Sequence, residues 1–177
     1  MVLVVTVWLE ATERDRIAKE AASRRILETG GPIFGYATDD AVVITRVFGP
    51  GPGARHRPTR FSANPSWVKA CIDEVFVSTD GKESYLGDWH SHPLGGSSPS
   101  GSDVNAVKSI AVSDDVALSR PTVLIQATKT FRRRIHMGSL ASYRWDGERE
   151  QLIAQELRVA SLPSNLRAAI QTDEGKA

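Results

Sequence analysis

The sequence holds a single cysteine, Cys71, among its 177 residues. One thiol excludes an internal disulfide and a zinc finger, because each needs at least two sulfur atoms. Lysine and arginine total 22 against 21 for aspartate and glutamate, so the net charge of +1 produces no overall field that would attract nucleic acid or anionic lipid. The apolar start, residues 1–9, is too short to span a bilayer and lacks the basic residues of a leader. We therefore expect a soluble, cytoplasmic protein.

The length and the ordinary content of hydrophobic residues, 41%, predict one domain. Apolar runs and turn residues predict strands at 1–9, 33–36, 41–48, 84–92, 121–127, 131–135 and 139–145. Helical patterns cover residues 12–29, 66–78, 100–113 and 148–160. This mixture indicates an α+β (mixed α/β) fold. We expect the domain to cover residues 1–165, with a disordered polar tail at 166–177 and a flexible insertion at 49–65.

The segment with the clearest chemistry is His90-Ser-His-Pro93 followed by Ser100 and Asp103. Residues two apart on a strand point to the same side, so both imidazoles can reach one ion. Pro93 ends the strand, and the next helix begins near Ser100, which brings the carboxylate of Asp103 back towards the histidines. Two imidazoles and one carboxylate leave a fourth position open for water, as in catalytic zinc sites.

A reaction of that kind needs a base to accept the proton of the water. Glu28 is the candidate, because it ends the first predicted helix and precedes Thr29-Gly30-Gly31, where glycines permit a close approach of the backbone. Glutamate at a helix end is otherwise an ordinary solvated residue. Likewise, an isolated His-x-His pair is more often structural, and Ser100-x-x-Asp103 also has the form of a helix capping box.

Three neighbouring residues have simpler interpretations. Cys71 lies among apolar helical residues and is expected to be a buried thiol. Trp89 points away from the histidines and is expected in the core. Asp88 shares the strand side of His90 and is a candidate for orienting its imidazole.

The chain resembles the JAB/MPN domain family and its JAMM metallopeptidase signature. The resemblance is carried by Glu28-Thr-Gly-Gly-Pro-Ile-Phe-Gly35, by His90-Ser-His-Pro93, and by Ser100 and Asp103 at the signature spacing. It implies a cytidine-deaminase-like sheet flanked by helices. By the same resemblance His90, His92 and Asp103 bind one Zn²⁺ per chain, Glu28 is the general base, and Ser100 stabilises the oxyanion.

The resemblance also implies a function. Family members are peptidases and isopeptidases that often cut after the C-terminal glycine of ubiquitin or a ubiquitin-like modifier. Residues 85–92 look like the small bacterial branch, whose members are encoded beside E1- and E2-like proteins, including in antiphage operons. We therefore expect a ubiquitin-like protein or its conjugate as substrate, with E1- and E2-like proteins as further partners and no membrane partner.

Two other classes of function remain open at this point. The stretch from His90 to Asp103 is also similar to the RadC family of nucleic-acid-associated proteins, for which residues 131–134 and the arginines at 55, 57 and 60 would contact phosphates. The net charge and the Glu28-Thr-Gly-Gly sequence count against it. A non-catalytic binder of a ubiquitin-like partner is the other alternative. The 49–65 loop would then be a partner surface for an acidic patch or tail, or merely a solubilising loop.

Overall fold

The computed structural model describes residues 4–93, 95–131 and 134–163. The strands are β1 (Thr6–Glu10), β2 (Gly30–Ala37), β3 (Ala41–Val47), β4 (Arg55–Arg57), β5 (Arg60–Ser62), β6 (Ser84–His92), β7 (Thr122–Phe131), β8 (Arg134–Asp146) and β9 (Gln151–Ala160). The helices in these ranges are α1 (Ala11–Ser23), α2 (Pro65–Ser78) and α3 (Gly101–Ala111). The mixed α/β fold predicted from the sequence is confirmed.

Seven strands form a closed barrel in the order β1-β3-β2-β6-β7-β8-β9. The barrel closes because β1 pairs in parallel with both β3 and β9. The strand pair β6 and β7 is also parallel, with His90 opposite Ile125 and His92 opposite Ala127. Beside the barrel, β4 and β5 form a separate two-stranded hairpin.

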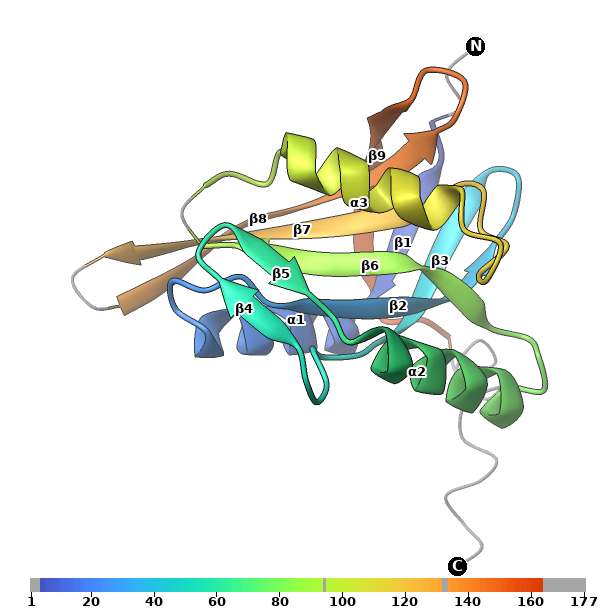
Figure 1. Ribbon diagram of the computed structural model, residues 1–177, viewed down its shortest axis with the longest axis horizontal. Coiled ribbons are helices and arrows are strands. Elements are labelled where there is room, and N and C mark those ends of the chain that lie inside the picture. Colours follow the sequence, from blue (N-terminus) through green and yellow to red (C-terminus); the bar gives the residue numbers. More distant parts are fainter. Residues whose placement is uncertain (1–3, 94, 132–133, 164–177) are drawn as a thin grey trace, which may run out of the picture.

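The helices lie on opposite faces of this sheet (Figure 1). Helix α1 lies on the inner face and buries Ile17 against the apolar side chains of β1, β2, β3 and β6. On the outer face, α2 packs Cys71 and Val75 onto Phe34. Helix α3 packs there through Val107, beside residues of β7 and β8. The outer face therefore holds α3 directly beside the end of β6.

The C-terminal segment corrects one sequence prediction. Residues 148–160 were expected to be an amphipathic helix, but Gln151–Ala160 is strand β9. Its glutamate, leucine and alanine residues favour a helix only weakly, and tertiary pairing overrides such preferences. Here β9 pairs along one edge with β8 and along the other with β1, and Leu157 packs against the core.

Several element ends also differ from the sequence prediction. Helix α1 ends at Ser23, so Glu28 lies on the connection to β2 rather than on the helix. The expected insertion at 49–65 contains the hairpin β4–β5. The strands predicted at 131–135 and 139–145 are not separated by a break, because β8 runs without interruption through Met137 and Gly138. The predicted tail at 166–177 lies outside the described residues.

No helix in the described part of the chain combines the length and hydropathy needed to cross a membrane.

Candidate metal centre

Strand β6 and helix α3 bring three metal-ligating side chains to one point. His90 and His92 project from the same side of β6, and their Nε2 atoms are 3.0 Å apart. Asp103, in the first turn of α3, places Oδ1 3.2 Å from His90 Nε2 and Oδ2 3.4 Å from His92 Nε2. Each of the three side chains is about 12% exposed. The cluster is thus largely desolvated but still open to solvent on one side.

The spacing of these atoms fits a tetrahedral ion. Ligands at about 2.0–2.1 Å from zinc in tetrahedral geometry are separated from one another by about 3.3 Å. The imidazole of His92 donates from Nδ1 to the carbonyl oxygen of Gly96 at 3.0 Å, which leaves its Nε2 as an acceptor in the neutral ring. Several lone pairs therefore point at one position, and a cation there would satisfy all of them.

Charges in the cluster are mutually dependent. Burial raises the pKa of Asp103, but hydrogen bonds from His90, His92 and Ser100 overcome this and hold it well below its usual range. Burial lowers the pKa of His92, and its hydrogen bonds with Asp103 and Gly96 raise it to a net value above the ordinary one. Asp103 is therefore a permanent carboxylate, and a proton and a metal ion compete for His92.

Ser100 caps α3 and also contacts the cluster. Its backbone N–H and its hydroxyl both donate to Asp103 Oδ2, at 2.6 and 2.7 Å, and Asp103 N–H points back to Ser100 Oγ at 3.4 Å. This reciprocal capping box holds the carboxylate towards the histidines. The helix-capping role is thereby confirmed. Any bond from the Ser100 hydroxyl to a substrate requires this hydroxyl to turn away from Asp103.

Glu28 lies beside this cluster and is 8% exposed. Burial raises its pKa to about 7, with a further increase from Asp103 and a decrease from His92. Its backbone N–H donates to the carbonyl of Arg57 at 2.8 Å, and His56 Nδ1 donates to the carbonyl of Glu28 at 2.9 Å. The hairpin β4–β5 therefore fixes the backbone of Glu28 through these two hydrogen bonds. No sequence pattern indicated this role for His56.

Strands β2 and β6 pack closely at the residues that follow Glu28. Gly30 pairs with His90, and a Cβ at Gly30 would collide with the Trp89 carbonyl and approach the Phe61 ring to 2.9 Å. Ser91 and Thr29 bond reciprocally, with Ser91 N–H donating to the Thr29 carbonyl at 2.8 Å and Thr29 N–H donating to Ser91 Oγ at 3.0 Å. The glycine after Thr29 is thus required for this close approach.

Other sequence expectations have mixed outcomes. Cys71 and Trp89 are buried as predicted, at 0% and 1% exposure. Asp88 accepts a hydrogen bond from the Tyr85 hydroxyl at 3.0 Å, and burial raises its pKa to about 6. Its role in orienting His90 stays a prediction. Residues 132 and 133 of the predicted phosphate-contacting stretch lie outside the described residues.

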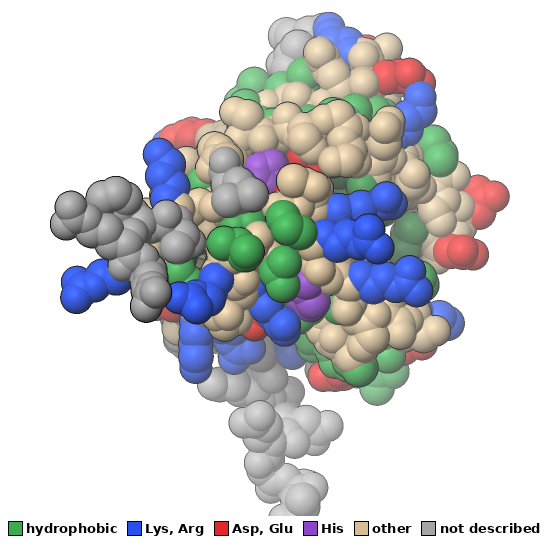
Figure 2. Space-filling model, turned by 60° about the vertical axis from the view of Figure 1, so that its left-hand side comes forward, with side chains coloured by type: hydrophobic (Ala, Val, Ile, Leu, Met, Phe, Trp, Pro, Cys, Tyr) green, Lys and Arg blue, Asp and Glu red, His purple; other side chains and the backbone are tan. Residues whose placement is uncertain are grey.

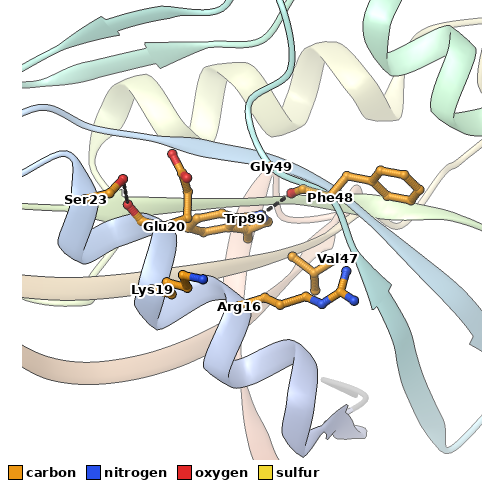
Figure 3. A pocket seen from close by; sticks show the side chains of 8 residues that line it. All are labelled: Arg16, Lys19, Glu20, Ser23, Val47, Phe48, Gly49 and Trp89. Carbon is orange, nitrogen blue, oxygen red and sulfur yellow. Dashed lines mark hydrogen bonds between the residues drawn. The ribbon is translucent and has the colours of Figure 1, made fainter.

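A hollow of about 290 Å³ lies between α1 and the segment that follows β3 (Figure 3). It is lined by Arg16, Lys19, Glu20, Ser23, Val47, Phe48, Gly49 and Trp89. Trp89 donates from its indole N–H to the Phe48 carbonyl at 2.8 Å. None of the five residues predicted for catalysis or metal binding lines this hollow, so it is separate from the metal centre.

Comparison with known proteins agrees with this geometry. The family model for prokaryotic homologues of the JAB domain matches residues 10–139, well over half of the chain. The chain belongs to this family. The matched range includes Glu28 and the three clustered side chains, so the metal centre lies inside the JAB domain.

Two kinds of curated relatives share the JAB domain of this chain. A probable metalloprotease of Sinorhizobium fredii is 30% identical over 121 residues, which cover 67% of this chain and 74% of that protein. A CD-NTase/cGAS isopeptidase of Enterobacter hormaechei is 24% identical over 68% of this chain and 66% of its own length. Another CD-NTase/cGAS isopeptidase, from Vibrio cholerae, is 28% identical over 104 residues, which cover 59% of this chain and 64% of that protein. This JAB protein is accordingly a JAMM-type peptidase or isopeptidase.

The solved structures include the same fold. The solution structure of protein DSY2949 from Desulfitobacterium hafniense superposes with a TM-score of 0.63 and 16% sequence identity, covering 90% of this chain and 96% of that one. At this level of identity the similarity concerns the fold of the JAB domain alone.

Proposed function

We propose that this protein is a cytoplasmic zinc peptidase or isopeptidase that hydrolyses the amide bond after the C-terminal glycine of a ubiquitin-like modifier. The observation that carries the proposal is the convergence of His90, His92 and Asp103 beside a buried Glu28. The names of two isopeptidase relatives support a conjugated protein as substrate. The family resemblance adds E1- and E2-like proteins as further partners. One Zn²⁺ per chain fits the two imidazoles and one carboxylate.

Each side chain has one task in this reaction. Zinc held by the three ligands would supply a Lewis acid that polarises the carbonyl and lowers the pKa of water. Glu28 takes the proton of the attacking water and then gives it to the leaving amine; burial brings its pKa near neutral, which suits both transfers. Ser100 turns its hydroxyl from Asp103 towards the carbonyl oxygen as negative charge develops there.

The test combines metal content with hydrolysis. Protein purified without added metal is expected to contain close to one zinc per chain by elemental mass spectrometry. It should also release the leaving group from ubiquitin-like proteins bearing an amide-linked fluorophore at the C-terminal glycine. Absence of zinc, even after reconstitution, or absence of cleavage across such a panel would refute the proposal.

Replacing Ser100 with alanine is expected to lower kcat about 100-fold, the usual effect of removing one oxyanion donor. The same change also removes a helix cap, which typically costs about 1 kcal/mol of stability. Steady-state kinetics together with thermal unfolding separate these effects. A folded Ser100→Ala protein with wild-type kcat would leave Ser100 only its capping role.

Replacing His56 with leucine is expected to lower kcat about tenfold, because Glu28 loses one of the bonds that fix its backbone. KM and zinc content should change little. His56→Asn is the matched control, since its side-chain amide offers an N–H near the position of Nδ1. Equal kcat values for the two variants would show that this hydrogen bond does not position Glu28.

Acidification is expected to weaken zinc binding. The ion requires a neutral His92, and the pKa of His92 is raised in the metal-free protein. The affinity for zinc therefore reaches its full value above that pKa. Below it, the affinity falls about tenfold per pH unit for each imidazole proton that must leave. Competition with a chelator at several pH values measures this slope. An affinity independent of pH would argue against imidazole ligation.

A further inference from the structure

The hairpin β4–β5 presents two different faces. His56 lies opposite Phe61 in the hairpin, and both turn inward. His56 bonds to the Glu28 carbonyl, while the Phe61 ring lies over Gly30 and its backbone N–H donates to the Glu28 carboxylate. The inner face of the hairpin is therefore one wall of the metal centre.

The outer face of the same hairpin carries three arginines. Because side chains alternate along a strand, Arg55 and Arg57 project from the side opposite to His56. Arg60 is the cross-strand partner of Arg57 and so projects from that outer side too. All three are exposed. We call this group, Arg55, Arg57 and Arg60, the arginine face.

The charges of the arginine face are not balanced within the described structure. Like charges directly opposite each other on two strands are destabilising, and Arg57 faces Arg60 in this way. Residues 49–65 contain no aspartate or glutamate. Across residues 4–93, 95–131 and 134–163, none of the three arginines forms an ion pair. An anionic group from outside the chain would relieve this repulsion.

We propose that the arginine face binds an acidic segment of the protein substrate, on the side of the hairpin that faces away from the metal centre. The inference rests on the proposed function, because it names the chemistry of the substrate surface beside the metal centre. Arginine pairs with carboxylates through two parallel hydrogen bonds, so three arginines on one short ribbon fit several closely spaced Asp or Glu side chains. Such pairs fix the register of the substrate and speed its association.

The wider surface favours an acidic protein segment over a nucleic acid. Figure 2 shows Lys and Arg side chains gathered around histidines at this end of the molecule, with Asp and Glu mostly at its margin. The excess of positive charge is local, because the chain as a whole carries a net charge of only +1. Nucleic-acid binding usually relies on a broader basic footprint than one three-residue cluster.

Binding to a defined probe tests the proposal. The probe is a fluorescein-labelled peptide with three glutamates upstream of a C-terminal Gly-Gly, and its partner for comparison has glutamines at those positions. Fluorescence anisotropy with the zinc-loaded full chain compares wild type with Arg55→Gln/Arg57→Gln/Arg60→Gln. The matched control, Lys82→Gln/Arg120→Gln/Arg149→Gln, removes three exposed charges near the other ends of strands β6, β7 and β8.

We expect the glutamate peptide to bind about tenfold more tightly than the glutamine peptide, and the arginine-face variant to lose this difference. The control variant should retain it. The single variant Arg60→Gln should lose part of the difference between the two peptides. This variant keeps the test valid if the triple variant fails to fold. Equal affinity for both peptides, or unchanged binding by a folded arginine-face variant, would overturn the proposal. Tighter binding of single-stranded DNA, lost in the same variant, would also overturn it.

Anisotropy needs no bond cleavage, so this result is independent of turnover. Glutamate-dependent binding without hydrolysis of any modifier would refute the proposed function and leave the arginine face as a docking surface. Hydrolysis of a modifier by a protein that binds both peptides equally would support the proposed function and refute the arginine face as a docking surface.

Discussion

Glu28→Gln is expected to abolish turnover almost completely while leaving zinc in place. Glutamine has the shape of glutamate and can still accept the Phe61 N–H, but it cannot take up a proton near neutral pH. General acid–base catalysis contributes about 10²–10⁴-fold in rate, and here one residue serves both proton transfers. We therefore expect kcat to fall by at least about 10³-fold, measured by single-turnover cleavage of a modifier fusion.

Two controls make this result specific. Zinc content should remain at the wild-type value, because Glu28 is not part of the three-ligand cluster. Glu74→Gln removes one carboxylate from an exposed position on α2 and should leave kcat unchanged. Substantial turnover by a zinc-loaded Glu28→Gln protein would show that another group is the base.

His92→Ala is expected to eliminate metal binding and, with it, activity. Loss of a residue that merely supports a ligand typically costs 10–100-fold in metal affinity, and loss of one of three ligands should exceed this. A metal at about 1,000 times its Kd stabilises the folded chain by about 4 kcal/mol, so the variant should also lose the rise in Tm that zinc produces. Elemental analysis and thermal unfolding with and without zinc measure both effects.

A different histidine supplies the control for this experiment. His136 is exposed on β8, outside the cluster, and His136→Ala should keep the zinc content and the zinc-dependent Tm. If His92→Ala retained one tightly bound zinc, His92 would not be a ligand and the ion would have to bind elsewhere.

The candidate metal cluster could be predicted from the sequence because its parts are local. His90 and His92 lie two apart on a strand, and Asp103 enters at the start of the next helix, so alternation and capping already bring them close. The structure confirms this proximity, with all ligand atoms within 4.8 Å. Their catalytic and metal-binding roles stay predictions until the variants are measured.

The features that could not be predicted depend on contacts distant in sequence. His56 reaches Glu28 only because the hairpin folds back over β2, and nothing in the sequence around His56 signals that partner. Likewise, residues 151–160 favour a helix locally and become a strand only because β1 and β8 are both available for pairing. Periodicity describes one segment at a time and misses such pairings.

The joint between β1 and β9 has a consequence for biosynthesis. All residues of the candidate centre, from Glu28 to Asp103, leave the ribosome well before β9, whereas β1 keeps one unpaired edge until β9 arrives. An open strand edge invites pairing with other chains, and pairing between distant segments slows folding. A nascent chain can therefore assemble its reactive centre while its sheet still has an open edge, and the pairing of β9 with β1 removes that edge.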